Sequence, residues 1–362
     1  MKTHDTGTDA DGPDSSCACC SPRREFLGKL AALGAAAVLP GEALAQAAKR
    51  AAAARKPFRV DVHHHLVSPG YLEALGAQRS GSSPNWTPAK SIEDMDKSGI
   101  AISILSLIQP GPWTGDVETS RRLARESNEY GVQVARDHPG RFGNFAQLPL
   151  PDAEGSLKEI EYALDTLKVQ GIGLMTSYQG KYLGDPAFAP VWEELNRRKA
   201  LVYTHPLTPE CCRNTVEGIP PGVVEYATDT TRTIASLVFS GTAAKYPDIR
   251  WIFSHGGGTM PFLVSRFTRE EATMKERQKR LPHGVMYELN KFYYDTAQAN
   301  HWAALASLFR LVPPTQVLYG TDFPFRPGAE VNQGLAQFHT NPRYLRLIER
   351  DNAMRLMPSL RA

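Results

Sequence analysis

The chain has 362 residues, of which 42% are hydrophobic and 22% are charged, and its formal net charge is +3. These values are ordinary for a globular protein. The basic excess is not clustered in the body of the chain, which argues against nucleic-acid binding.

The first part of the chain differs in composition from the rest. A polar, cysteine-containing segment leads to the pair Arg23 and Arg24, after which a weakly apolar run extends to about residue 39. Paired arginines, a short apolar run and the small-residue signal Ala43-Leu44-Ala45 are typical of a twin-arginine export leader. The run is too short for a membrane anchor. We therefore predict a leader over residues 1–45, a periplasmic location and a mature protein without membrane attachment.

The rest of the chain, residues 51–362, alternates strand-like apolar runs with amphipathic helical stretches. Strands are predicted at 58–62, 101–107, 142–147, 171–175, 200–204, 249–253, 291–294 and 315–319. Helices are predicted at 87–98, 116–137, 152–169, 186–198, 229–245, 260–277, 299–309, 330–338 and 342–356. This alternation predicts one α/β domain, a single (β/α)8 TIM barrel. A doubly wound open sheet is the competing fold.

Two long irregular segments follow predicted strands. Residues 66–86 follow the first strand and carry Gly, Ser and Pro without a clear period. Residues 207–226 follow the fifth strand. Loops after strands lie at the active face of a barrel, so we interpret the first segment as an insertion that forms a lid or a substrate loop.

The first predicted strand runs into three consecutive histidines. Side chains alternate along a strand, so His63 and His65 are expected on one side and His64 on the other. Two imidazoles at one strand end are suited to binding a divalent metal. Asp61 is expected on the same side as the ligand pair, where it would orient one of the imidazoles.

Three further strands end in a residue that can bind or serve a metal. His205 ends the fifth strand in Tyr-Thr-His-Pro, and we predict it as a ligand. Asp322 ends the eighth in Gly-Thr-Asp-Phe-Pro-Phe, as a ligand that can also hold a proton. His255 ends the sixth in Ser-His-Gly-Gly-Gly, as a general acid or base, with direct ligation as the alternative. The three glycines are expected to let the backbone approach a bound ligand.

The ligand types indicate one metal ion. The fourth strand does not end in a lysine, whose carbamylated side chain could bridge a second ion. Nitrogen and oxygen ligands without a thiolate favour zinc, with manganese or iron as alternatives. The adjacent pair Cys211 and Cys212 is predicted to form no structural disulfide, because neighbouring cysteines bridge poorly.

These motifs together resemble a known family. Val-Asp-Val-His-His-His, Thr-His-Pro, Ser-His-Gly-Gly-Gly and Gly-Thr-Asp-Phe-Pro-Phe are similar to motifs of the decarboxylase-like branch of the amidohydrolase superfamily. That branch includes aminocarboxymuconate-semialdehyde, γ-resorcylate and 6-methylsalicylate decarboxylases. The resemblance covers about residues 59–357 and looks closest to the 6-methylsalicylate enzymes. It implies a metal-dependent carbon–carbon lyase acting on a small aromatic carboxylic acid.

The resemblance also implies roles for single residues. It makes His63, His65, His205 and Asp322 metal ligands and His255 the catalytic histidine. Arg266 matches an arginine that reaches across a dimer to the substrate carboxylate of the neighbouring site, which implies a homodimer. Arg232 is a weaker candidate for anion binding. Among the aromatics near predicted strand ends, Phe323 and Trp113 are the expected substrate contacts.

Three hypotheses of function follow. The first is non-oxidative decarboxylation of a salicylate-type acid, in which Asp322 or His255 delivers a proton to the ring carbon bearing the carboxylate. The alternative is metal-dependent hydrolysis of an amide, lactone or ester, because the same ligands supply a Lewis acid and a proton carrier. The third is a periplasmic binding protein without turnover, which has no need to keep His255 beside Asp322.

Overall fold

The computed structural model describes residues 58–75, 85–213 and 215–361. They belong to the unit that extends from Lys56 to Ala362. The predicted leader, residues 1–45, lies outside the described residues, so the export hypothesis remains a prediction. Within the described ranges, no helix combines the length and the apolar character that crossing a bilayer requires.

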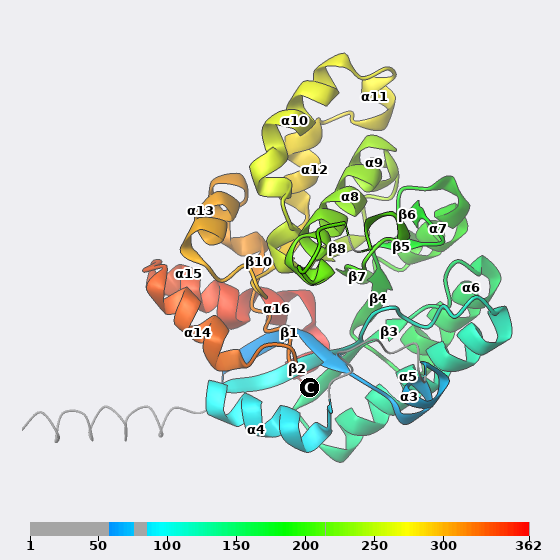
Figure 1. Ribbon diagram of the computed structural model, residues 1–362, viewed down its shortest axis with the longest axis vertical. Helices are drawn as coiled ribbons and strands as arrows, with labels where there is room; N and C mark the ends of the chain where they lie inside the picture. Colours follow the sequence, from blue (N-terminus) through cyan, green and yellow to red (C-terminus); the bar gives the residue numbers. More distant parts are fainter. Residues whose placement is uncertain (1–57, 76–84, 214, 362) are drawn as a thin grey trace, which may run out of the picture. The chain divides into compact units, whose positions relative to one another are not determined.

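Eight parallel strands form one sheet in chain order (Figure 1). They are β1 (Arg59–Leu66), β2 (Ile100–Leu107), β3 (Phe142–Gln147), β4 (Gly171–Met175), β7 (Leu201–His205), β8 (Arg250–Phe253), β9 (Tyr293–Asp295) and β10 (Val317–Leu318). Each strand pairs with the next one in this series. The sequential order contradicts a doubly wound sheet, whose order reverses partway.

The segment after β10 closes the sheet against β1. The Val62 amide donates to the Tyr319 carbonyl at 2.9 Å, and the Asp322 amide donates to the His63 carbonyl at 2.8 Å. A parallel bridge joins His64 and Phe323. The strands therefore form a nearly closed barrel, the arrangement of a TIM barrel, as the sequence predicts.

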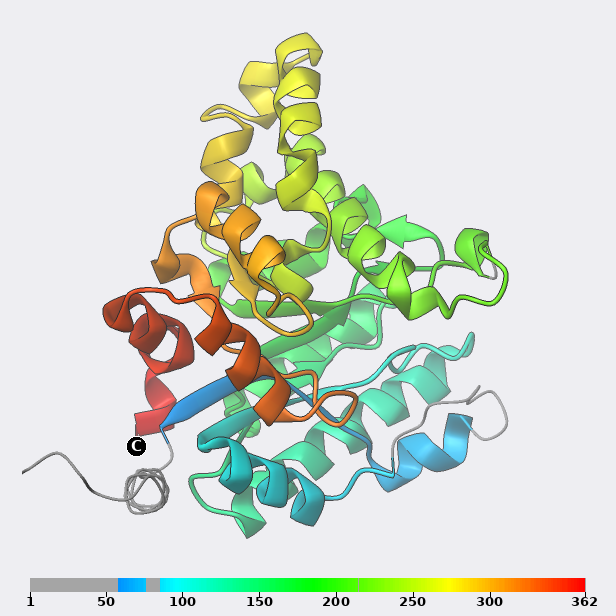
Figure 2. The same ribbon diagram turned by 60° about the vertical axis from the view of Figure 1, so that its left-hand side comes forward.

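Helices surround the strands, as Figure 2 shows. They are α3 (Pro69–Leu75), α4 (Pro88–Ser98), α5 (Val117–Asp137), α6 (Ala153–Glu161), α7 (Ala189–Arg197), α8 (Glu225–Phe239), α9 (Thr242–Lys245), α10 (Met260–Thr273), α11 (Arg277–Arg280), α12 (Val285–Lys291), α13 (Trp302–Leu311), α14 (Gly328–Gln337), α15 (Pro342–Arg346) and α16 (Asn352–Leu356). Local signals explain their ends: in α4, Thr87 caps the first turn and Gly99, at φ 68°, ends the helix.

Several elements differ from the prediction. The first strand continues through the three histidines to Leu66 instead of ending at residue 62. The expected seventh strand starts two residues late, because α12 extends to Lys291. A short hairpin of β5 (Ser177–Tyr178) and β6 (Lys181–Tyr182) was not predicted. Part of the segment 66–86, predicted to be irregular, is helix α3, and its residues 76–84 lie outside the described ranges.

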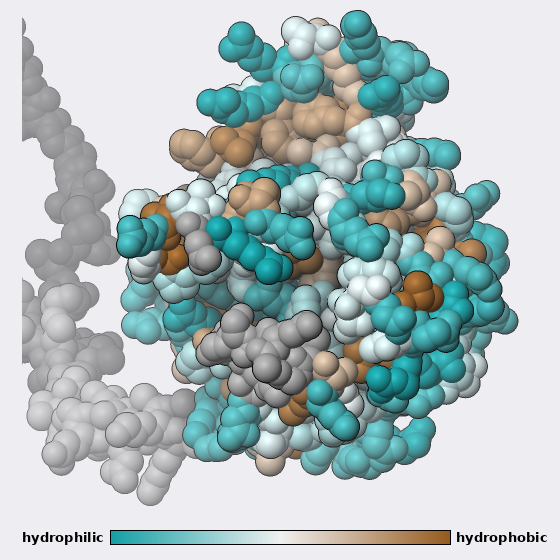
Figure 3. All heavy atoms as spheres, turned by 45° about the vertical axis from the view of Figure 1, so that its right-hand side comes forward, coloured by the Kyte–Doolittle hydropathy of each residue, from teal (hydrophilic) through white to brown (hydrophobic). Residues whose placement is uncertain are grey.

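The barrel interior below the strand ends is apolar. Inward side chains such as Val60, Phe145 and Ile252 pack together, and Met354 from α16 joins the same cluster. Parallel strands buried on both faces require near-continuous apolar runs, which is the pattern the sequence shows. The filled interior leaves the polar strand ends as the place where side chains can meet a ligand. On the outer surface, Figure 3 shows mainly hydrophilic residues, with apolar residues grouped in the upper part.

Candidate metal centre

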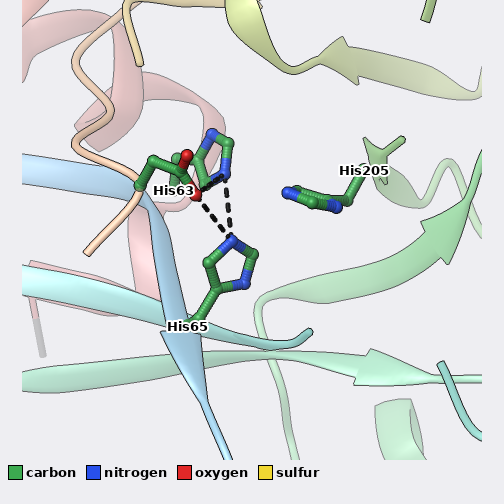
Figure 4. A group of neighbouring side chains, drawn as sticks. His63, His65 and His205 are labelled. Carbon is green, nitrogen blue, oxygen red and sulfur yellow. Dashed lines mark hydrogen bonds and ion pairs between the residues drawn. The ribbon is translucent and has the colours of Figure 1, made fainter. Parts of the chain in front are cut away.

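Four buried side chains converge at the carboxyl ends of the strands. His63, His65, His205 and Asp322 each offer one ligand atom, and these atoms all lie within 4.8 Å of one another. Figure 4 shows the three imidazoles directed towards one space. His63 and His65 come from β1, His205 is the last residue of β7, and Asp322 follows β10. The structure thus brings together the four predicted ligands.

The hydrogen bonds of the imidazoles leave their Nε2 atoms facing the centre. The Nδ1 atom of His63 donates to Asp295 Oδ2 at 2.8 Å, and that of His205 donates to the Pro206 carbonyl at 2.8 Å. The Nδ1 atom of His65 faces the Ser106 carbonyl at 3.4 Å. A carboxylate or a carbonyl only accepts, so each of these Nδ1 atoms carries a proton, and each Nε2 is the atom that can offer a lone pair to a cation.

The distances within the group fit a shared cation. Nε2 of His63 lies 3.2 Å from Nε2 of His65 and 3.1 Å from Asp322 Oδ1. Asp322 Oδ1 lies 2.9 Å from Nε2 of His65. The buried Nε2 of His205 has no hydrogen-bond partner among the described residues. A buried acceptor without a partner is costly, and a divalent ion among three nitrogens and one oxygen would satisfy it.

The carboxylate that orients His63 is Asp295, which the sequence analysis missed. Besides His63, Asp295 accepts the backbone amides of His255 at 2.9 Å and Ala297 at 3.0 Å. One fully buried side chain therefore fixes both a predicted ligand and the predicted catalytic histidine. The missed signal was present in the sequence, because Asp295 ends β9 just as His205 ends β7.

The prediction that Asp61 orients a ligand imidazole is wrong. Its side chain accepts instead from Nδ1 of His64 at 3.0 Å and from the backbone amides of His63 and Thr321. The cause is a shift in the β1–β2 register between Asp61 and His64. Such an irregularity changes which face later side chains occupy, so Asp61 and His64 share one face. As predicted, His64 points away from His63 and His65, and it contacts Ser91.

His255 lies beside the group with its ring unengaged. Its side chain is buried, and neither ring nitrogen has a hydrogen-bond partner among the described residues. Its Nε2 is 3.6 Å from Asp322 Oδ2, and its ring centroid is 4.9 Å from that of His63. An unengaged imidazole next to a carboxylate is suited to proton transfer.

The glycines after His255 pack against protein, not against ligand space. Gly258 has φ 68°, and a Cβ atom there would lie 1.9 Å from the Ala227 carbonyl oxygen. The expected reason for these glycines, close approach to a ligand, is therefore wrong for Gly258. A second close approach occurs at Gly320, where an added Cβ atom would lie 2.8 Å from Cβ of His63.

Two residues of the centre have left-handed backbone conformations. Asp322 has φ 69° and His255 has φ 54°. Residues other than glycine rarely adopt such angles, and strain of this kind gathers at functional sites. The hydrogen bonds of the Asp322 and His255 amides to His63 and Asp295 hold these conformations.

The protein groups create a potential that favours a cation. Burial lowers the pKa of His63, but Asp295 and Asp322 outweigh it and raise that pKa to about 10. Burial raises the pKa of Asp322, yet His63 and the other imidazoles hold it well below its usual range. Burial lowers the pKa of His65 and, more strongly, that of His205. Positive charge is thus stabilised between His63 and Asp322, and neutral imidazoles complete the group.

The predicted substrate contacts lie in three different settings. Phe323 stacks on His64, with ring centroids 4.8 Å apart, on the side of β1 away from the ligand group. Trp113 is half-buried and packs against the outer core. Arg266 is exposed on α10. Their roles in substrate binding remain predictions.

Other side chains lie closer to the centre. The ring of Phe325 lies 5.6 Å from that of His65, and the ring of Tyr226 lies 6.4 Å from that of His205. Gln298 donates to Asp322 Oδ2 through its side-chain amide. The second Phe of the Asp-Phe-Pro-Phe motif is thus the one near a ligand histidine. These three residues lie in loops or at a helix end, where strand alternation does not predict the direction of a side chain.

Known proteins share the sequence and the fold. The amidohydrolase family model matches residues 60–358. Decarboxylase macB of Penicillium terrestre is 39% identical over 295 residues, which cover 76% of this chain and 86% of that protein. The 6-methylsalicylic acid decarboxylase of Penicillium expansum is 35% identical over 280 residues, which cover 74% of this chain and 86% of that protein.

A solved structure shows the same architecture. It is a dihydroxybenzoic acid decarboxylase from Polaromonas sp. with bound manganese and the inhibitor 2-nitroresorcinol. The TM-score is 0.73 at 21% identity, and the match covers 84% of this chain and 98% of that one. At this identity the likeness shows the common fold.

Proposed function

This chain belongs to the amidohydrolase family, and on that premise we propose that it is a metal-dependent lyase that decarboxylates a small aromatic acid of the salicylate type. The observation that carries the proposal is the buried group of three Nε2 atoms and one carboxylate oxygen within 4.8 Å, with His255 beside it. The relatives named as decarboxylases support the choice of reaction.

The four-residue group is suited to one divalent ion. His63, His65, His205 and Asp322 would hold it through three nitrogens and one oxygen. When bound, the ion supplies Lewis acidity to the carboxylate and the ortho hydroxyl of the substrate. The donor set suits zinc, manganese or iron, and the manganese in the Polaromonas enzyme makes manganese a stronger candidate than the sequence alone does. Metal analysis of the purified protein identifies the ion.

The chain's own contribution to the reaction is proton transfer. A proton moves from His255 or Asp322 to the ring carbon that bears the carboxylate, which becomes tetrahedral. The bond to the carboxylate then breaks, carbon dioxide leaves, and the bonding electrons restore the aromatic ring. His255 Nε2 and Asp322 Oδ2 lie 3.6 Å apart, so both groups border the same space and either can face the ring carbon.

The position of the hydroxyl group provides the test of this function. Purified protein is incubated with 6-methylsalicylate, with salicylate and with two matched acids, 3-hydroxybenzoate and 2-methoxybenzoate. We expect carbon dioxide release from the two ortho-hydroxy acids and none from the matched acids, because only the former offer a carboxylate and a hydroxyl to one ion. Carbon dioxide evolution and the phenolic product are both measured.

The same experiment distinguishes the hydrolytic alternative. Phenyl acetate and a small aryl lactone are tested under identical conditions. Cleavage of these compounds without release of carbon dioxide from any ortho-hydroxy acid would replace the lyase by a hydrolase. Retention of an unchanged acid with measurable affinity and no turnover would support a binding protein.

We also propose that the protein is a homodimer in which Arg266 reaches the partner's substrate. Arg266 is exposed and has no hydrogen bond or ion pair with any described residue of its own chain. Apolar side chains are exposed on the same helix and on α12: Phe262 on α10, 85% exposed, and Met286 and Tyr287 on α12. Figure 3 shows apolar residues grouped in the upper part of the molecule, where these helices lie. A surface of this kind is typical of a contact between proteins.

Replacing Arg266 by glutamine tests this proposal. We expect the KM for the aromatic acid to rise about tenfold or more with little change in kcat, because a charge-assisted hydrogen bond to the carboxylate is lost. Arg269→Gln changes an exposed arginine of the same helix and serves as the control. Light scattering gives the molar mass. A monomeric wild-type protein, or equal KM values for both variants, would contradict the proposal.

The location of the mature protein is proposed from the leader. Arg23 and Arg24 with the following apolar run support twin-arginine export of residues 1–45 as a signal, and hence a periplasmic enzyme. That pathway carries folded proteins, which suits a protein that binds its metal before export.

A further inference from the structure

Two neighbouring thiols lie outside the metal centre, in the segment that follows β7. Cys211 is exposed and Cys212 is half-buried, and both are free thiols. Their Sγ atoms are 2.7 Å apart, so both sulfurs face the same way. The proposed reaction uses neither of them, and neither belongs to the buried ligand group.

A guanidinium group contacts the half-buried member of this pair. Arg232 of α8 donates to Cys212 Sγ at 3.6 Å. Its other terminal nitrogen lies 3.6 Å from Glu225 and 3.9 Å from Asp229, so two carboxylates attract the guanidinium. The hydrogen bond between Cys212 and Cys211 raises the pKa of Cys212. A raised pKa makes a thiol a poor nucleophile at neutral pH, which argues against covalent catalysis by this residue.

The spacing of the sulfurs selects the kind of ligand. An ion with linear coordination needs two sulfurs on opposite sides, about 4.6 Å apart for metal–sulfur bonds of about 2.3 Å. A pyramidal centre such as trivalent arsenic holds its sulfurs at a bent angle and therefore much closer together. The distance between Cys211 Sγ and Cys212 Sγ is closer to the span of a bent centre than to that of a linear one, so a small opening of the pair admits the bent centre, and the exposure of Cys211 gives access to it.

We propose that Cys211 and Cys212 form a dithiol site for trivalent arsenicals. In the binding step two S–H and two As–OH bonds break, two As–S bonds form, and two molecules of water leave. No oxidant or reductant is needed, because arsenic stays trivalent and the sulfurs stay thiolate-like. The site is independent of the proposed decarboxylation, and its test uses no substrate.

Phenylarsine oxide is the probe for this site. The full chain also carries Cys17, Cys19 and Cys20, so these three are replaced by serine to leave Cys211 and Cys212 as the remaining thiols. We expect one phenylarsenic group per chain by intact mass and the loss of both thiols to a colorimetric thiol reagent. A small dithiol such as dimercaptopropanol should restore both thiols.

Cys211→Ser and Cys212→Ser, each in the same background, are the matched variants. We expect each to bind phenylarsine oxide at least 100-fold more weakly, because the second As–S bond forms at a high effective concentration. Circular dichroism checks that both variants fold. Affinities within threefold of the parent, or two arsenic groups per parent chain, would overturn the proposal, since each thiol would then act alone.

Discussion

Replacing Asp322 by asparagine is expected to lower kcat for decarboxylation by about 10³-fold, within the usual range for loss of a proton-transfer group. Oδ1 of Asp322 faces the Nε2 atoms of His63 and His65, and Oδ2 faces His255. Asparagine keeps the shape and tolerates the left-handed backbone at this position, so the fold is retained. It loses the negative charge and cannot carry the proton. Rates are measured by carbon dioxide release at saturating metal.

Asp229→Asn provides the control for this variant. Asp229 is also a fully buried carboxylate, and it accepts from Thr176 and from the Tyr182 hydroxyl at 2.7 Å, with no predicted metal ligand among its hydrogen-bond partners. We expect Asp229→Asn to lose about 1–3 kcal/mol of unfolding free energy and to keep kcat within about threefold. The proposed role of Asp322 would fail if Asp322→Asn, at equal metal content, kept more than a tenth of the wild-type kcat.

The second large effect is expected at Asp295, which touches no substrate and acts through His63. We expect Asp295→Asn to weaken divalent-metal binding by about 10- to 100-fold. If the new amide nitrogen faces His63, it takes the lone pair of Nδ1 and moves the ring proton to Nε2, which can then no longer bind a metal. If the amide is reversed, its NH₂ group faces the donating amides of His255 and Ala297. Competition with a chromogenic chelator measures the affinity.

Asp61 offers a matched carboxylate for this experiment. It also is fully buried, accepts two backbone amides and contacts one imidazole, but that imidazole is His64. Asp61→Asn is therefore expected to lower the unfolding free energy while leaving metal affinity within a few fold. Asp295→Glu keeps the carboxylate and is expected to restore only part of the metal affinity, because the longer side chain shifts the contact with His63. Equal metal affinities for Asp295→Asn and Asp61→Asn would contradict the orienting role of Asp295.

The meeting of the four ligands could be predicted from the sequence, because it follows from the topology of the barrel. Once eight strands run parallel in a barrel, their carboxyl ends lie at one end, and residues that end the strands must meet there. His205 and Asp322 are 117 positions apart in the chain, yet both follow from this rule. The sidedness of His63 and His65 followed from alternation within one strand.

Strand alternation did not predict which carboxylate accepts the hydrogen bond of His63. Alternation placed Asp61 beside the ligand imidazoles, but one irregularity in the β1–β2 register turned it towards His64. A shift of one residue changes the face of a side chain, and its position is not visible in the apolar pattern. Asp295 directly follows the predicted strand 291–294, so the strand-end rule reaches it, but only the folded chain shows that it contacts His63 and His255.

Sequence alone determined the alternation of strands and helices, the polar residues at the strand ends, and thus the three histidines and the aspartate that meet. Tertiary structure alone decided that Asp295 and not Asp61 supports His63, that Gly258 fits against Ala227, and that Phe325 and Gln298 border the group. The physical reason is that sequence periodicity is a local property, which gives the direction of a side chain within one helix or strand. Contacts between elements depend on strand register and loop conformation, which periodicity does not encode.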